Sequence, residues 1–168
     1  MSQTVLVVYA SKHGTTREVA ESVASTLTSH GFDVELQAAD AVATLDGVDA
    51  VVLGGGLYMA RLHADARRFL ARHRERLAEM PLAVFAMGPG STSEKDIAAS
   101  RKQLDHALAK VSELQPVEIA IFGGALDPTK LHFPFNRMPA CDARDWDAIE
   151  AWALRVADNL AGAVAPRA

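Results

Sequence analysis

Small polar residues and one glycine fill the stretch from Ser11 to Thr16, directly after a run of apolar residues. The hydroxyl groups of Ser11, Thr15 and Thr16 can donate hydrogen bonds, and Gly14 lets the backbone wrap closely around a ligand. If a helix begins here, its first N–H groups lack partners and its dipole favours an anion. This pattern therefore indicates a phosphate site. The alternative is that Ser11 and Thr15 only cap the helix.

Three other kinds of site do not fit these residues. The GxGxxG fingerprint of dinucleotide-binding domains is absent, and so is the Gly-Lys-Ser/Thr ending of a nucleoside-triphosphate loop. A receiver-type signalling domain would need paired acidic residues at the end of the first strand. Tyr9-Ala-Ser-Lys12 stands there instead.

A second candidate stretch, Gly54-Gly-Gly-Leu-Tyr-Met-Ala-Arg61, begins with three consecutive glycines. These glycines predict that a flat group approaches the backbone closely. Tyr58 can then stack on an aromatic ring, and the thioether of Met59 can contact it. In the alternative interpretation the glycines form a turn, and Tyr58 and Met59 pack into the neighbouring core. A third stretch, Met87-Gly-Pro-Gly-Ser-Thr92, offers further backbone donors and hydroxyls.

Strand-like and helix-like segments alternate along the chain and position these stretches. Short apolar or alternating runs predict strands over residues 4–9, 32–38, 49–54, 82–87 and 117–122. Apolar residues at helical spacing predict helices over residues 15–30, 62–79, 94–113 and about 145–162. This alternation predicts an α/β fold, a doubly wound parallel sheet of five strands with helices on both faces. Ligands of such sheets bind beyond the carboxyl ends of the strands, where all three stretches fall.

The first stretch resembles the Ser/Thr-x-Thr-Gly-x-Thr loop with which the flavodoxin family holds the phosphate of flavin mononucleotide (FMN). Ser11, Gly14 and Thr16 match that pattern. His13 replaces a threonine, which removes one hydroxyl contact, although its backbone N–H can still serve. The resemblance implies a flavodoxin-like sheet with strand order 2-1-3-4-5.

Further segments are similar to flavodoxin-domain proteins related to menaquinone-dependent protoporphyrinogen dehydrogenase. They are residues 10–18, 54–61, 122–126 and Cys141-Asp-Ala-Arg-Asp-Trp146, and the similarity covers nearly the whole chain. It implies FMN bound by the three stretches. The implied FMN-binding residues are Ser11, Lys12, His13, Gly14, Thr15, Thr16, Gly55, Gly56, Leu57, Tyr58, Met59, Met87, Gly88, Pro89 and Gly90.

The expected function is that of an FMN-dependent oxidoreductase. It would pass electrons between an organic donor, such as a protoporphyrinogen-type substrate, and a quinone or similar acceptor. No catalytic residue of the chain itself is expected, because the flavin accepts the electrons. The alternative is a non-enzymatic flavodoxin-type electron carrier with a redox protein partner.

Between Arg61 and Glu79 the second helix region has six arginines and only three acidic residues, Asp65, Glu75 and Glu79. Arg61, nearest the glycine stretch, is the candidate contact for a carboxylated substrate. An anionic membrane surface is a second interpretation, and an ordinary solvated helix face with ion pairs is a third. The stretch from Leu126 to Arg144 has no clear periodicity and several apolar residues, which predicts a long loop. It is interpreted as a lid or interaction surface, or as a satellite core.

The whole-chain properties set outer limits. With 168 residues and 17.9 kDa, we expect one domain over residues 1–168. A formal charge of −4 argues against nucleic acid as the main partner. The single cysteine, Cys141, excludes an intramolecular disulfide and a multi-cysteine metal site, and no other spacing suggests a metal. No membrane-spanning run or signal peptide is evident, so a cytoplasmic location is expected, and a homodimer remains open.

Overall fold

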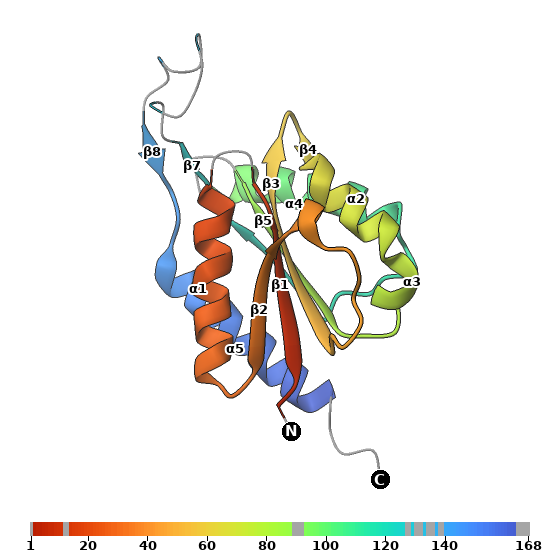
Figure 1. Cartoon of the computed structure of the whole chain (residues 1–168). Coiled ribbons are helices and arrows are strands. Elements are labelled where there is room, and N and C mark those ends of the chain that lie inside the picture. Colours follow the sequence, from red (N-terminus) through yellow and green to blue (C-terminus); the bar gives the residue numbers. More distant parts are fainter. Residues whose placement is uncertain are drawn as a thin grey trace.

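Five parallel strands form the centre of the fold in the computed structural model, which describes residues 2–11, 14–88, 93–126, 129, 133, 137 and 140–163. These strands are β1 (Thr4–Ala10), β2 (Asp33–Ala38), β3 (Ala50–Tyr58), β5 (Leu82–Met87) and β6 (Glu118–Phe122). Their order across the sheet is β2-β1-β3-β5-β6 (Figure 1). The short strand β4 pairs only with β3, so β5 and β6 are the fourth and fifth parallel strands along the chain. The predicted fold class and strand order are therefore confirmed.

Helices cover both faces of this sheet. They are α1 (Thr15–Ser29), α2 (Ala64–Arg72), α3 (Arg74–Leu77), α4 (Glu94–Ala109) and α5 (Trp146–Ala163), with a 3₁₀ turn η1 at Ala39–Ala41. Helices α1 and α5 pack on one face, and α2, α3 and α4 pack on the other. None of the helices that the structure describes has the length and apolar character needed to span a membrane.

The alternation of side chains along β1 shows how the sheet divides the core in two. Val5 and Val7 lie in the cluster beneath α1 and α5, whereas Leu6 and Val8 lie in the cluster beneath α2 to α4. All four are at most 1% exposed. Both faces of a central parallel strand are buried, which is why this segment is a continuous apolar run.

The region between β3 and β5 differs from the prediction in two ways. The third strand continues to Tyr58 and turns back into a short antiparallel strand, β4 (Arg61–Leu62). The single helix expected over residues 62–79 is divided into α2 and α3. At the division His73 leaves helical geometry (φ −106°, ψ 14°), and its ring packs against Phe69 at 5.0 Å between centroids.

The long loop expected at 126–144 begins and ends in a two-stranded antiparallel ribbon. The ribbon consists of β7 (Ala125–Leu126) and β8 (Cys141–Asp142) and lies beyond the start of α1 (Figure 1). A Cβ on Gly123 would lie 2.3 Å from the Ala143 carbonyl oxygen, so the two chain segments meet backbone to backbone. Most of the loop between the two strands lies outside the described residues, and so do the lid and satellite-core interpretations.

Candidate functional site

A glycine and one hydrogen bond characterise the described part of the link between β1 and α1. Gly14 adopts a positive φ of 84°, a conformation that residues with a Cβ rarely take. Its N–H donates a hydrogen bond to the Ser11 Oγ at 2.8 Å. The Ser11 hydroxyl proton remains able to donate to a ligand, because the oxygen acts here only as acceptor. Lys12 and His13 lie outside the described residues.

Helix α1 begins without the side-chain cap that the alternative interpretation supplied. Gly14 occupies the N-cap position, and no side chain of the described residues caps the helix. Thr15 therefore does not act as a cap, and Ser11 bonds within the turn. The first-turn N–H groups thus lack a side-chain acceptor. Thr16, in the same turn, is 1% exposed, and its Oγ1 has no hydrogen-bond partner among the described residues.

The three glycines lie inside β3, and side chains of the protein itself fill the space beside them. A Cβ on Gly54 would come 2.1 Å from the ring of Phe85, and one on Gly55 would come 2.8 Å from Leu62. A Cβ on Gly56 would meet the Tyr58 ring at 2.8 Å. The flat group inferred from Gly54 is thus the buried ring of Phe85. The loop expected from Gly54 onward is therefore corrected to the carboxyl-terminal part of strand β3.

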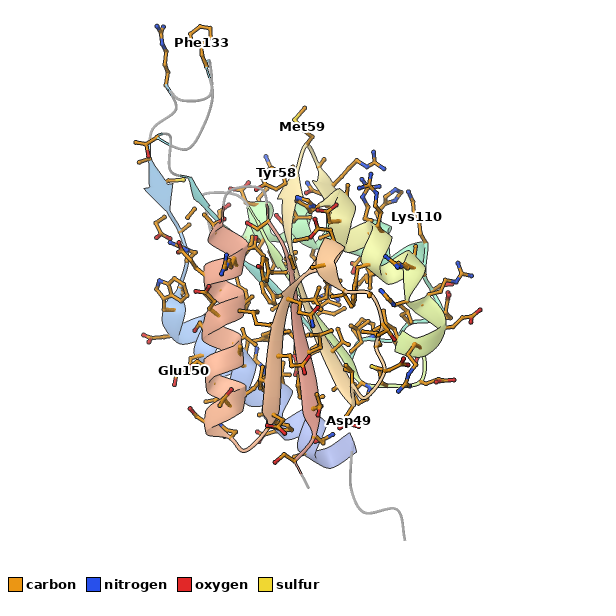
Figure 2. The ribbon with its side chains drawn as sticks, viewed as in Figure 1. Asp49, Tyr58, Met59, Lys110, Phe133 and Glu150 are labelled. Carbon is orange, nitrogen blue, oxygen red and sulfur yellow. The ribbon has the colours of Figure 1, made fainter. Side chains whose placement is uncertain are left out.

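The hairpin beyond the glycines carries the predicted ring-contact residues. Met59 and Ala60 form its turn with positive φ values of 49° and 63°. Met59 is 95% exposed at the tip, so it does not pack into the core, and Tyr58 is 37% exposed (Figure 2). The Tyr58 ring meets His63 edge to face at 6.0 Å. Leu57 packs instead against the core under α2 to α4.

The third stretch begins at the carboxyl end of β5. Met87 is 3% exposed and belongs to the core beneath α1 and α5. The Gly88 N–H donates to the Phe122 carbonyl at 2.7 Å, which extends the pairing of β5 with β6 by one residue. Pro89 and Gly90 lie outside the described residues, as do Ser91 and Thr92.

Arg144 connects the ribbon to the first turn of α1. Its guanidinium binds the carboxylates of Glu18 and Asp142, and it lies 5.0 Å from the ring centroid of Trp146. Only 11% of the Arg144 side chain is exposed. The hydrogen bond from Arg144 is the main cause that lowers the pKa of Asp142, and the same bond raises the pKa of Arg144.

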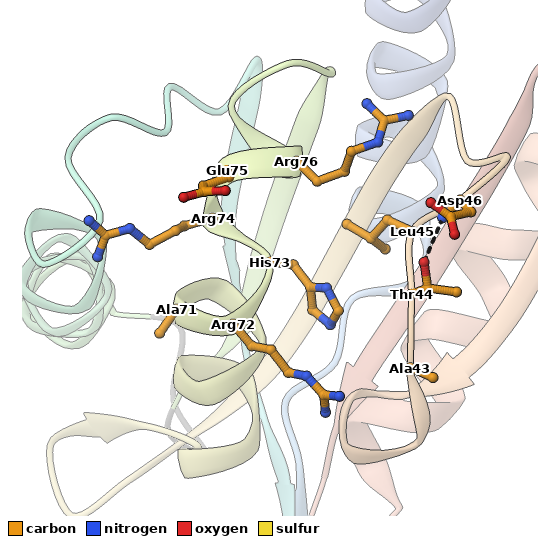
Figure 3. A pocket seen from close by; sticks show the side chains of 10 residues that line it. All are labelled: Ala43, Thr44, Leu45, Asp46, Ala71, Arg72, His73, Arg74, Glu75 and Arg76. Carbon is orange, nitrogen blue, oxygen red and sulfur yellow. Dashed lines mark hydrogen bonds between the residues drawn. The ribbon is translucent and has the colours of Figure 1, made fainter.

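Residues of the basic segment line several hollows beside α2. One lies between the 43–46 loop and residues 71–76, with the His73 ring pointing into it (Figure 3). Burial and the charge of Arg72 lower the pKa of His73, against a backbone hydrogen bond at Val42 that raises it. Another hollow lies next to the hairpin and includes Arg61, the predicted substrate contact. A further hollow lies between α2 and α4, and Arg67 lines it as well.

The carboxyl ends of the strands bring the three predicted stretches to one edge of the sheet. Tyr9 and Ala10 of β1 pair with Gly54 and Gly55 of β3, and Gly56 pairs with Met87 of β5. Within the described residues no group of three or more His, Cys, Asp or Glu side chains can hold a metal.

A model of the flavodoxin domain family matches residues 6–138, and the chain belongs to this family. Flavodoxin domains bind FMN, so FMN is the cofactor, and the protein is a flavoprotein of the electron-transfer type. Protoporphyrinogen IX dehydrogenase [quinone] of Escherichia coli K12 is 23% identical over 123 residues, which cover 72% of this chain and 68% of that relative.

Solved structures show the same fold. A cysteine-to-alanine mutant of a Pseudomonas aeruginosa flavodoxin superposes with a TM-score of 0.62 at 20% identity, over 95% of this chain and all of that one. Oxidised flavodoxin 2 from Bacillus cereus gives 0.59 at 22% identity, over 93% of this chain and 99% of that one.

The residues at the start of α1 fit the phosphate of FMN. In the described part of the chain, the buried Thr16 hydroxyl has no partner and no side chain caps the helix start, where Gly14 has a positive φ. A buried hydroxyl without a partner costs about 1–3 kcal/mol, which a bound phosphate oxygen would offset. Sequence reasoning missed Glu18 and Arg144, which join this turn to the ribbon, and it missed Arg67 in the hollow beside the hairpin.

Proposed function

We propose that the protein is an FMN-dependent oxidoreductase that passes electrons from an organic donor to a quinone. The observation that carries the proposal is the buried Thr16 hydroxyl in the first turn of α1, which has no hydrogen-bond partner among the described residues. The similarity to a relative named for a porphyrinogen donor and a quinone acceptor supports the choice of substrates. A protoporphyrinogen-type compound is therefore the first donor to test.

The residues of the first turn hold the phosphate in this proposal. Ser11 and Thr16 donate through their hydroxyls, Thr15 adds a third, and Gly14 gives the backbone the required turn. Lys12 and His13 contribute to the same loop. The N–H groups at the start of α1 complete the cradle, aided by the helix dipole.

The hairpin and the third stretch hold the ring system. Tyr58 offers an aromatic face and Met59 a polarisable thioether at the tip. Gly55, Gly56 and Leu57 place this hairpin against the core, and Met87 and Gly88 lead the chain into Pro89 and Gly90. Bound FMN supplies the electron-accepting and electron-donating chemistry, so the protein provides orientation and exclusion of water rather than an acid or base.

The apolar character of a quinone fits the exposed side chains at this end of the molecule. Met59 is 95% and Phe133 70% exposed. Both lie beyond the carboxyl ends of the strands, Met59 at the hairpin tip and Phe133 farther out, past β7 and β8 (Figure 2). Contact with a quinone, or with the membrane surface that holds quinones, would cover them.

Steady-state turnover tests the proposal against simple electron carriage. The FMN-loaded protein is supplied anaerobically with protoporphyrinogen and menadione, and porphyrin formation is followed by its fluorescence. The proposal predicts many turnovers per chain and none for the FMN-free protein. Efficient reduction by a ferredoxin-type reductase, with no turnover of either small molecule, would instead assign the role of carrier.

A further inference from the structure

A hollow of about 390 Å³ lies between the hairpin and the start of α2 and is positively charged. Its lining residues are Tyr58, Arg61, Leu62, His63, Ala64 and Arg67. Two guanidinium groups are thus present, and no carboxylate lines the hollow. Because arginine keeps its charge at any physiological pH, the hollow favours an anion.

These two arginines differ from most of their neighbours in having no acidic partner. Arg68 pairs with Asp65 at 3.3 Å, Arg74 with Glu113 at 2.8 Å, and Arg76 with Glu79 at 3.2 Å. In the part of the chain that the structure describes, neither Arg61 nor Arg67 makes an ion pair. The unpaired positive charge near the hairpin therefore lies at this hollow, on Arg61 and Arg67.

A hydrogen bond to a nearby backbone carbonyl holds the Arg67 side chain in place. Its Nε donates to the Leu62 carbonyl at 2.9 Å, and the residue is half-buried. This bond uses one donor and leaves the terminal nitrogens for a ligand. A carboxylate accepts two parallel N–H bonds from such a fixed group, and less side-chain entropy is lost on binding.

The hollow adjoins the hairpin that the proposed function assigns to the flavin. Tyr58 belongs to both, and Arg61 is paired with Tyr58 across the turn. A ligand held here by its acidic groups would have the rest of its body beside the hairpin. This is the arrangement that a substrate with carboxylate side chains requires.

We propose that the hollow lined by Arg61 and Arg67 binds the carboxylates of the organic substrate, a molecule with at least two such groups. This inference rests on the proposed function, since it places the substrate beside the FMN site. It adds the residues that recognise the substrate and the groups of the substrate that they bind.

Binding of a dicarboxylic porphyrin to the FMN-loaded protein tests the inference. The probes are protoporphyrin IX and its dimethyl ester, which keeps the ring and lacks the charges. Binding is followed by the quenching of porphyrin emission. We expect the free acid to bind at least about tenfold more tightly than the ester, and added salt to weaken binding of the acid alone.

Arginine variants locate the effect. Arg61→Gln and Arg67→Gln should each weaken binding of the free acid by about tenfold, and the ester should be unaffected. Arg72→Gln is the matched control. Arg72 lies on α2, as Arg67 does, but it lines the hollow beside the 43–46 loop, and it makes no ion pair among the described residues. It should change binding by less than about twofold.

Three results would overturn the inference: equal binding of acid and ester, unchanged affinity in both hollow variants, or no binding of the free acid at all. These failures are distinct from failure of the proposed function. FMN affinity and menadione reduction by an artificial donor, measured on the unaltered protein, test the proposed function separately from the carboxylate site.

Discussion

At the scale of single residues, the Thr16 hydroxyl links the fold to the cofactor. Core positions of this kind are usually apolar, yet Thr16 buries an oxygen without a partner among the described residues. Valine has the same shape without the oxygen. Comparing threonine with valine at position 16 therefore distinguishes the effect of this side chain on stability from its effect on FMN binding.

Thr16→Val should have opposite effects on stability and on cofactor binding. We expect the free energy of unfolding of the FMN-free protein to rise by about 1 kcal/mol, because an unsatisfied buried hydroxyl is removed. FMN affinity should fall by about tenfold, because a donor to the phosphate is lost. Chemical denaturation and flavin fluorescence titration measure the two quantities. Unchanged FMN affinity would remove Thr16 from the site.

Glycine residues show where inference from the sequence was incomplete. The positive φ of Gly14 agrees with its predicted place in a tight turn. The sequence suggests that a flat ligand lies beside Gly54, but the ring beside it belongs to Phe85, 31 positions further along the chain. A glycine in a strand reports that something lies close to the backbone. It does not report whether that group is a ligand or the protein's own core.

At the scale of elements, the contact between β3 and β5 depends on the pair Gly54 and Phe85. Gly54→Ala should lower the free energy of unfolding by about 1–3 kcal/mol, because the fully buried ring has no space to move. The loss should be smaller in a Phe85→Leu background, where the ring is absent. Gly162→Ala, with nothing within 4 Å, is the control. Thermal denaturation gives all three values, and an equal loss in both backgrounds would disprove the contact.

The ribbon formed by β7 and β8 is held to α1 by Arg144. Arg144→Met should therefore release it, since Glu18 and Asp142 lose their shared cation. We expect limited proteolysis between residues 126 and 141 to become several times faster, with little change in the melting temperature. Arg17→Met, which breaks the exposed pair with Glu21, should leave the cleavage rate unchanged. Equal cleavage of Arg144→Met and the unaltered protein would contradict this role.

Apolar periodicity in the sequence predicts the strands and helices, but it does not predict where a helix is interrupted. The five strands and the outer helices each carry a repeated pattern, and local repetition is what a sequence displays directly. The division at His73 depends on how its ring packs on Phe69. The Glu18–Arg144 pair joins residues 126 positions apart, so no local pattern could indicate it.

At the scale of the whole molecule, the balance of charge changes with pH through His73. Burial and Arg72 lower the pKa of this histidine in the folded protein. Below its ordinary pKa, the unfolded chain takes up a proton that the folded protein resists, so stability falls as the pH drops from about 7 to about 5. His73→Gln should reduce the steepness of this fall, measured by denaturation at several pH values. The neighbouring Asp46 and Glu75 remain in both proteins, and an identical slope would refute the role of His73.

The sheet topology also explains why the sequence predicts the location of the site but not its individual contacts. Parallel strands end at one edge, so polar stretches that follow separate strands converge there. The pairings of Gly54 with Tyr9 and of Gly56 with Met87 bring this about. The charged hollow beside the hairpin was indicated only through Arg61, because the pairing of each arginine is decided by tertiary contacts.

The central claim is that the start of α1 binds the phosphate of FMN, and comparing FMN with riboflavin tests it most directly. Riboflavin carries the same ring and lacks the phosphate. Fluorescence titration of the FMN-free protein should show one FMN per chain, bound at least about a hundredfold more tightly than riboflavin. Equal affinity for the two flavins, or no uptake of FMN, would contradict the account.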